Sequence, residues 1–442
     1  MKVSRRGFLS GSAGAIGAAG LGIGGAGPVI AAPRPDLLPP PRGKRVVICG
    51  GGWGGLTAAK YLRLAAPDAE VVLIERNPTF FSCPMSNKWL VDLVDTSYLT
   101  HDYLTPARTH GYTFIQTEVS AIERDRKLVH TAAGRIQYDY MILAAGIRYD
   151  YTAWFGDDRQ AADFTRMNYP AAYIPSAEHL TLKRKVQAFA KGDLVMVLPP
   201  PPHRCPPSPY ERACLISWLL KTKRVPGRVV ILDPKPAPAP IGEGYRRAFD
   251  ELYKDQITYV PNAKVAAVDP HGKVIRTAAG DFRFDDAILM APHQAGEMVW
   301  MADLIGKTKE GKPTGWADQD PLYLHANADP DVFIIGDSVG RASQLFGFYP
   351  KAGHVANRLG KIAARHVAAR MAGKELEKLL PDNLCFMMVN GSPKEALSVQ
   401  FAYDLSAFDE IQQQTTENHE RSEELVVTDF AWAESLYEDM LT

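Results

Sequence analysis

The fold of this chain is decided by the stretch RVVICGGGWGG at residues 45–55. The five residues before the glycines are β-rich, and an Ala- and Leu-rich segment that suits a helix follows over residues 56–64. A second apolar strand, residues 70–74, ends at Glu75. Strand, glycine turn, helix, strand and acid in this order predict a dinucleotide-binding unit of the Rossmann type.

The glycines and the acid of this unit have expected roles at a bound nucleotide. Gly50, Gly52 and Gly55 let the backbone approach a pyrophosphate at the helix N-terminus. Glu75 is expected to accept hydrogen bonds from a ribose. The alternative is a tight turn between strand and helix that binds no ligand.

An internal repeat predicts that the chain contains two related α/β modules. One copy is TAAG at residues 131–134 with ILAAG at residues 142–146, and the other is TAAG at residues 277–280 with ILMAP at residues 288–292. Each copy predicts a hairpin that feeds back into a parallel strand, so the second module is inserted in the first. The alternative is a chance resemblance between two turns.

The second module lacks the glycine turn of the first. Its apolar strand over residues 194–198 runs into Pro199–Pro202 with no glycine. A pyrophosphate needs close backbone N–H groups, and proline has none. We therefore expect no NAD(P)H at this module, so the substrate must reduce the bound cofactor itself.

A Gly-Asp pair late in the chain indicates which nucleotide the first module binds. The apolar strand pattern VFII ends in Gly336-Asp337, and KAGH at residues 351–354 opens a long Ala-rich helix. In two-module flavoproteins such a Gly-Asp closes over the ribityl chain of FAD, and the next helix N-terminus points at the isoalloxazine ring. We therefore predict FAD, with Gly146, Asp337 and Gly353 among its ligands.

Composition and the first residues narrow the function. The 50 basic and 50 acidic residues give no nucleic-acid signature, five cysteines are too few for a disulfide scaffold, and the 11 histidines show no metal-ligand spacing. SRRGFL at residues 4–9 indicates a twin-arginine signal over residues 1–32, which predicts a periplasmic cofactor protein. A short membrane anchor is the alternative. Residues 33–42 form a Pro-rich linker, and no later stretch suits a membrane span.

The C-terminal tail is strongly acidic. Residues 404–442 contain eleven acidic residues and one basic residue, Arg421, with aromatic residues between them. An acidic surface speeds the encounter with a basic partner protein. The tail is therefore either a docking surface for such a partner or a solvated terminal helix.

Three further motifs resemble the flavoprotein subunit of flavocytochrome c sulfide dehydrogenase: FSCPMSN at residues 81–87, RCPPSPYER at residues 204–212 and PKAG at residues 350–353. The resemblance runs from about residue 44 to the tail and implies the disulfide-reductase type of fold. It implies an FAD-binding domain in two parts, at residues 43–150 and 286–375, with a second Rossmann-like domain between them at residues 151–285. A small α+β interface domain follows at residues 376–442.

The resemblance also implies roles for single residues. Cys83 takes the position of the cysteine that binds FAD through its 8α-methyl group, and Asn87 of the same motif is a further cofactor-binding residue. Cys205 takes the position of one of two redox-active cysteines, and Glu211 is the candidate proton acceptor for bound sulfide or thiol. Lys351 would stabilise the reduced, anionic flavin, and a c-type cytochrome subunit would accept the electrons.

The chain departs from that pattern at the second redox-active cysteine. Val339 stands in its place, two residues after the Gly-Asp, and the resemblance puts the next cysteine, Cys385, in the C-terminal domain. Cys214 is expected to face the core, too far along a helix from Cys205 for a disulfide. Three alternatives stay open: a lone Cys205 that carries a persulfide, direct reaction of a larger substrate at the flavin, or loss of sulfide oxidation.

The sequence thus predicts a periplasmic FAD-dependent dehydrogenase of sulfide or a related sulfur compound that passes electrons to a c-type cytochrome. One alternative is a sulfide:quinone-type oxidoreductase, although the acidic tail is a poor match for an anionic membrane surface. The other is a non-catalytic flavoprotein partner in a sulfur- or metal-handling complex.

Overall fold

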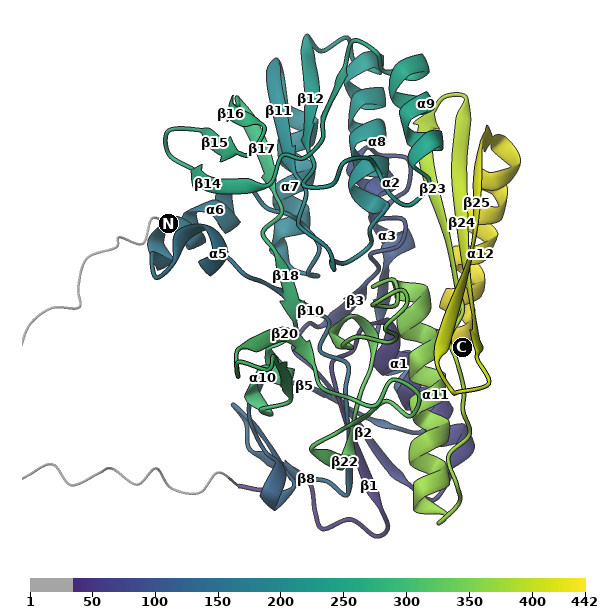
Figure 1. Ribbon diagram of the computed structural model, residues 1–442. Helices are drawn as coiled ribbons and strands as arrows, with labels where there is room; N and C mark the ends of the chain where they lie inside the picture. The colour runs from purple at the N-terminus through teal and green to yellow at the C-terminus, as the bar shows by residue number, and fades with distance from the viewer. Residues whose placement is uncertain (1–34) are drawn as a thin grey trace, which may run out of the picture. The chain divides into compact units, whose positions relative to one another are not determined.

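Two α/β modules and a C-terminal sheet make up the described part of the chain, residues 35–442 of a computed structural model (Figure 1). The predicted signal over residues 1–32 lies outside the described residues, as do the first two residues of the predicted linker. Within residues 35–442, no helix has the length and apolar character needed to cross a membrane.

A six-stranded sheet forms the centre of the first module. Its order is β21-β22-β9-β1-β2-β5, and every neighbouring pair except β21 and β22 is parallel. The strands are β1 (Arg45–Cys49), β2 (Glu70–Glu75), β5 (Thr113–Gln116), β9 (Tyr140–Leu143), β21 (His325–Ala326) and β22 (Asp329–Ile334). All of β1 is buried, as a parallel strand covered on both faces requires. Because β21 and β22 come from beyond the second module, the predicted insertion is confirmed.

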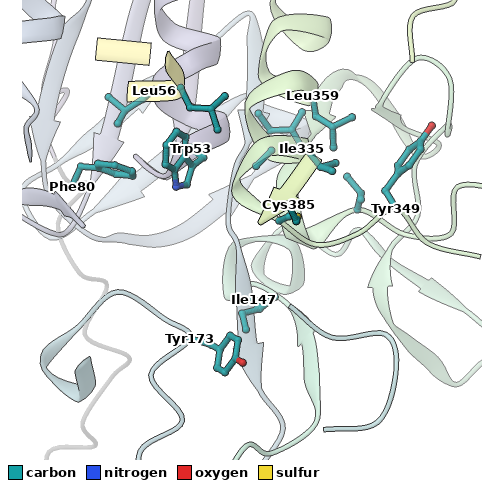
Figure 2. Close-up of a cluster of buried hydrophobic side chains, with 14 of the residues drawn as sticks. Trp53, Leu56, Phe80, Ile147, Tyr173, Ile335, Tyr349, Leu359 and Cys385 are labelled. Atoms are coloured by element: carbon teal, nitrogen blue, oxygen red, sulfur yellow. The ribbon is translucent and has the colours of Figure 1, made fainter. Parts of the chain in front are cut away.

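Helices α1 (Trp53–Ala65) and α11 (Gly353–Met371) pack closely on each other (Figure 1). A Cβ added at Gly360 would lie 2.6 Å from the carbonyl oxygen of Gly54, so this contact needs glycine. Figure 2 shows buried side chains of this region, among them Trp53, Leu56, Ile335 and Leu359. The predicted helix over residues 56–64 is confirmed and begins three residues earlier.

The second module contains a parallel four-stranded sheet in the order β13-β12-β11-β17. Its strands are β11 (Gly192–Val197), β12 (Gly227–Leu232), β13 (Ile257–Val260) and β17 (Asp286–Leu289), and its helices are α7 (Ala177–Ala188), α8 (Ser208–Thr222) and α9 (Gly242–Leu252). The antiparallel pair β10 (Ile147–Tyr149) and β18 (His293–Ala295) carries the chain between the modules. The boundary expected at residue 286 needs correction, because β17 pairs with β11 and belongs to the second module.

The internal repeat corresponds to one three-stranded antiparallel sheet in each module. The sheet of the first module consists of β6 (Val119–Glu123), β7 (Leu128–Thr131) and β8 (Arg135–Gln137). The sheet of the second module consists of β14 (Val265–Asp269), β15 (Val274–Thr277) and β16 (Gly280–Arg283). A threonine hydroxyl donates to a glycine carbonyl across each turn at 2.9 Å, from Thr131 to Gly134 and from Thr277 to Gly280. β8 leads into β9 and β16 into β17, which are the parallel strands that the repeat predicted.

The C-terminal residues form an antiparallel sheet covered by a helix. The elements are β23 (Asn383–Gly391), β24 (Lys394–Leu405), β25 (Ile411–Ser422) and α12 (Glu423–Leu441). Helix α8 packs against β23, and α12 against β24. The acidic tail is therefore part strand and part helix. Shorter elements are β3 (Thr79–Phe81), α2 (Ser86–Leu90), α3 (Thr96–Leu99), β4 (Thr100–Asp102), α4 (Leu104–His110), α5 (Thr152–Phe155), α6 (Arg159–Asn168), α10 (Glu297–Met301), β19 (Ile305–Lys307) and β20 (Pro313–Ala317).

Candidate active site

The turn between β1 and α1 needs glycine at two of its positions. Gly50 has a φ of 107°, and a Cβ there would lie 2.3 Å from the carbonyl oxygen of Ala144. A Cβ on Gly55 would lie 1.8 Å from the carbonyl oxygen of Gly50. At Gly52, by contrast, no atom lies within 4 Å of such a Cβ, and this residue lines a large cavity. The N-terminus of α1 therefore faces space that a phosphate can fill.

That cavity has a volume of about 800 Å³ and lies at the carboxyl ends of the strands of the first module. Most of the predicted cofactor-binding residues line it, namely Gly50, Gly52, Glu75, Cys83, Gly146, Asp337 and Gly353. Gly55 is not in its wall, because it packs against the turn itself. Asn87 and Lys351 line a smaller neighbouring cavity instead.

Glu75, at the end of β2, braces the glycine turn from the cavity wall. Its Oε2 accepts a hydrogen bond from the backbone N–H of Gly51 at 2.7 Å. Its Oε1 accepts from the backbone N–H and the side-chain amide of Asn77 at 2.9 and 2.7 Å. An ionised carboxylate offers about four acceptor sites, so the oxygens keep capacity for ribose hydroxyls.

Asp337 lies in the turn after β22 with one carboxylate oxygen unpaired. Its side chain is 5% exposed, and Oδ2 forms an ion pair with Nε of Arg204 at 3.0 Å. Oδ1 is buried and has no hydrogen-bond partner among residues 35–442. A buried acceptor without a partner costs free energy unless a ligand satisfies it. A hydroxyl of a bound ribityl chain would supply the donor that this oxygen lacks.

These residues fit FAD. The glycine turn and the N-terminus of α1 would hold the pyrophosphate, Glu75 the adenosine ribose, and Asp337 the ribityl chain. The cavity volume of about 800 Å³ lies within the range of volumes that is typical of cofactor-binding sites. Gly353, which begins α11, lines the same cavity, and a helix N-terminus there favours negative charge on a bound ring.

The smaller cavity, of about 60 Å³, contains both predicted catalytic residues, Cys205 and Glu211. Cys83, Arg204 and Gly353 line both cavities, so they form a common wall. The structure therefore brings the predicted sulfur-handling residues next to the predicted cofactor site.

Cys205 is held in an unusual backbone conformation. Its φ is 48°, and its N–H donates to the carbonyl oxygen of Lys351 at 2.8 Å, which fixes the proline-rich loop against the residues that open α11. Burial raises the pKa of the Cys205 thiol, Cys385 and Glu211 raise it further, and Arg204 opposes them. The residue therefore rests as a thiol and needs a base before it reacts as a nucleophile.

Glu211, in the first turn of α8, is the centre of a buried polar network. Its Oε1 accepts from Nζ of Lys88 at 3.2 Å and from the N–H of Met388 at 3.0 Å, and its Oε2 accepts from Nδ2 of Asn87 at 2.7 Å. Lys88 also lies 2.8 Å from Asp429 of α12. Burial opposes the charge of Lys88, but Asp429 and Glu211 outweigh it and raise the pKa of Lys88. Neither Lys88 nor Asp429 was predicted.

Lys351 lies between the Gly-Asp turn and the small cavity. Its Nζ donates to the carbonyl oxygens of Asp337 at 2.8 Å and Val339 at 2.9 Å, and it lies 3.9 Å from the ring centroid of Trp316. Burial lowers the pKa of Lys351 to about 7, although Asp337 opposes the shift. A negative charge placed beside it would favour its ammonium form.

The acid at the nucleotide position of the second module is hydrogen-bonded by protein side chains. Asp233 directly follows β12, in the place that Glu75 takes at the end of β2, but Asp233 is fully buried and accepts hydrogen bonds from the hydroxyls of Tyr210 at 2.5 Å and Tyr259 at 3.0 Å. Tyr210 belongs to α8, directly after the proline-rich loop. These partners were not predicted, although an acid after the second strand and a tyrosine in the RCPPSPYER motif were visible signals.

Known proteins match this chain in sequence and in fold. Residues 179–292 match the family described as sulfide dehydrogenase (flavocytochrome c) flavoprotein chain, central, and residues 44–185 match the pyridine nucleotide-disulphide oxidoreductase family. The sulfide-quinone reductase of Aquifex aeolicus (strain VF5) is 26% identical over 237 residues, which are 51% of this chain and only 53% of that protein. The sulfide dehydrogenase (flavocytochrome c) flavoprotein chain of Chlorobaculum thiosulfatiphilum is 52% identical over 44 residues, which are 10% of this chain and 92% of that sequence. The X-ray structure of the Aquifex aeolicus sulfide:quinone oxidoreductase has a TM-score of 0.68 and 18% identity, over 90% of this chain and 91% of that one.

The fold is that of the pyridine nucleotide-disulphide oxidoreductase class of two-module proteins, and the residues of the larger cavity fit FAD. The structural match supports the assignment of the fold, and the sequence matches support the assignment to a narrower family. Within that class, the chain belongs to the flavoproteins of the sulfide dehydrogenase and sulfide:quinone reductase type.

Proposed function

We propose that this chain is a periplasmic FAD-dependent dehydrogenase of sulfide, or of a related sulfur compound, that passes electrons to a c-type cytochrome. The observation that carries the proposal is the position of Cys205 and Glu211 in a cavity that shares a wall with the FAD cavity. Relatives named for sulfide support the substrate class. The hydrogen bonds that tyrosines donate to Asp233 support a substrate that reduces the flavin directly, and the twin-arginine pattern supports export.

The small cavity favours a small sulfur species. FAD, when bound, accepts two electrons and releases them one at a time. A cavity of about 60 Å³ holds only a few water-sized groups, which suits sulfide better than a larger compound. Cys205 would receive the sulfur, and Glu211, in the same cavity, would take the proton of the bound substrate.

We propose that FAD is attached covalently to Cys83. This residue lines both cavities and follows β3 within the first module. Burial raises the pKa of the Cys83 thiol, and Arg204 is the stronger of two cations that oppose the shift. The same guanidinium would therefore favour the thiolate that must attack the 8α-methyl group.

The proposed docking surface for the cytochrome is the outer side of α12. Several acids of the tail already pair with bases of this chain, among them Asp409, Glu420, Asp429 and Asp439. Within residues 35–442, four exposed acids of α12 have no ion-pair partner: Glu423, Glu424, Glu434 and Glu438. At about 3.6 residues per turn these four share one side of the helix, with one pair near its start and one pair towards its end, which gives a basic partner acidic groups along that side.

A quinone is the second candidate acceptor, because the Aquifex relative is named a sulfide-quinone reductase. The test is to reduce the purified holoprotein anaerobically with sulfide and to mix it with either a c-type cytochrome or a water-soluble quinone. We expect faster reoxidation by the cytochrome, and we expect the double variant Glu434→Lys/Glu438→Lys to slow it. Glu310→Lys, at an exposed acid before β20, is the matched control. Faster reoxidation by the quinone would favour the quinone-type enzyme instead.

A further inference from the structure

Cys385 lies in the same small cavity as Cys205, although the two residues come from distant parts of the chain. Cys205 belongs to the loop after β11, and Cys385 belongs to β23 of the C-terminal sheet. Both line the cavity of about 60 Å³, and Figure 2 labels Cys385 among the buried side chains. Cys49 and Cys214 are fully buried and line neither cavity. The cavity thus holds a thiol pair that the sequence did not reveal.

Both cysteines are fixed against the residues that open α11. The N–H of Cys205 donates to the carbonyl oxygen of Lys351 at 2.8 Å. Beside Cys385, the N–H of Leu384 donates to Nδ1 of His354 at 3.1 Å. Lys351 and His354 line the small cavity themselves. The proline-rich loop and β23 therefore converge on one short segment.

Glu211 provides a second connection between the proline-rich loop and β23. Its Oε1 accepts from the N–H of Met388, three residues after Cys385 on β23, at 3.0 Å. Helix α8, which carries Glu211, is itself tied to Cys205, because the N–H of Ser208 donates to the carbonyl oxygen of Cys205 at 3.0 Å. The backbones of both cysteines are thus braced from two sides.

Cys385 also affects the thiol of Cys205 electrostatically. Burial is the main cause that raises the pKa of Cys205, and Cys385 is the next cause, ahead of Glu211. Burial raises the pKa of Cys385 to about 12, against a hydrogen bond from Asn383. Like charges shift a pKa in this way only when they lie close together.

We infer that Cys205 and Cys385 are a redox-active pair, joined reversibly by a disulfide across the small cavity. Cys385 would thus supply the second sulfur that Val339 cannot. Oxidation takes two electrons and two protons from the two thiols and forms one S–S bond. Hydrosulfide then attacks one of the two sulfurs and breaks that bond, which leaves a persulfide on that cysteine and a thiolate on the other. The part played by the pair in turnover rests on the proposed function, in which FAD is the electron acceptor.

The pair can be tested without substrate or turnover. Purified holoprotein is first reduced with a thiol reductant, which is then removed, and is treated with diamide, an azo compound that takes up the two electrons and two protons. Free thiols are then alkylated in denaturant and counted by intact mass. We expect the wild-type protein to lose two thiols and to yield one cross-linked peptide pair that contains Cys205 and Cys385. Cys385→Ala and Cys205→Ala should lose none, whereas the matched control Cys214→Ala should still lose two.

The outcomes separate this inference from the proposed function. Cross-linking of any other cysteine pair, or the loss of no thiols in the wild-type protein, would overturn the inference, and neither result depends on how the variants fold. If the disulfide forms but sulfide does not reduce the flavin, the pair is supported and the proposed function is contradicted. If sulfide reduces the flavin but no disulfide forms, the proposed function is supported and the inferred pair is contradicted.

Discussion

Arg204 and Asp337 form a buried ion pair, with Nε and Oδ2 separated by 3.0 Å, that joins the two modules at the cofactor cavity. Arg204 belongs to the proline-rich loop of the second module, and Asp337 to the turn after β22 of the first. The guanidinium also donates to the carbonyl oxygen of Tyr173 at 2.6 Å. This ion pair therefore links the loop that carries Cys205 directly to the turn that lines the predicted cofactor cavity.

Loss of this ion pair should destabilise the protein strongly. We expect Arg204→Leu to lower the free energy of unfolding by roughly 3 kcal/mol or more, because Asp337 would remain as an uncompensated buried charge. Urea unfolding of the holoprotein measures the change. Arg228→Leu is the matched control, since its pair with Asp193 is largely exposed, and such pairs contribute about 0–1 kcal/mol. Equal losses in the two variants would contradict this view of the contact.

Buried histidines predict that stability falls in acid. Burial lowers the pKa of His203 to about 4 and that of His179 to about 3, whereas an unfolded histidine titrates near about 6.5. Below that pH the unfolded chain binds protons that the folded chain does not, so the free energy of unfolding decreases as the pH falls towards 4. Each histidine should approach a slope of about 1.4 kcal/mol per pH unit.

The slope is measured by urea unfolding at several pH values between about 7 and about 5. His179→Phe is expected to flatten it, because the aromatic ring keeps the contact with Phe81 and no longer titrates. His271→Gln, at an exposed histidine, should leave it unchanged. A slope that His179→Phe does not alter would show that this histidine is not the cause.

NADH should not reduce the flavin. Tyr210 and Tyr259 donate to Asp233, the carboxylate that would otherwise face a ribose in the second module, and the loop beside it is rich in prolines, which offer no N–H. Anaerobic addition of NADH is expected to leave the visible flavin spectrum unchanged, whereas dithionite bleaches it. Bleaching by NADH would mean that the second module still binds a dinucleotide.

Local patterns in the sequence predicted the first module and the two repeat hairpins. The run from residue 45 to Glu75 specifies β1, the glycine turn, α1 and β2 through neighbouring residues alone, and the TAAG turns specify their hairpins in the same way. The boundary at residue 286 was misplaced because the repeat indicates only where a hairpin lies. It does not indicate which sheet the next strand, β17, joins.

The residues that complete the candidate site depend on long-range packing and could not be predicted. Cys385 reaches the small cavity only because β23 packs on α8 and is hydrogen-bonded to the first turn of α11. Lys88 of α2 contacts both Glu211 and Asp429, which belong to two other elements. A lone cysteine, lysine or aspartate in an ordinary segment has no local pattern that points to such a partner.

Cys83→Ser should release the cofactor. If FAD is bonded to the Cys83 sulfur, acid precipitation leaves the flavin of the wild-type protein in the pellet, and the variant frees it into the supernatant. Flavin fluorescence of the two fractions, and of the protein band on a denaturing gel, measures the difference. Cys214→Ala, whose thiol lies outside both cavities, should behave as the wild type. Free FAD in the wild-type supernatant would contradict the attachment.

Anaerobic mixing of sulfide with the holoprotein tests most directly whether Cys205 receives substrate sulfur beside the flavin. The flavin absorbance is followed by stopped flow in the wild-type protein, in Cys205→Ala and in Cys214→Ala, each with its FAD content measured first. We expect rapid bleaching in the wild type and in Cys214→Ala, and a rate lower by orders of magnitude in Cys205→Ala with its FAD retained. Bleaching of Cys205→Ala at the wild-type rate would contradict the role of Cys205.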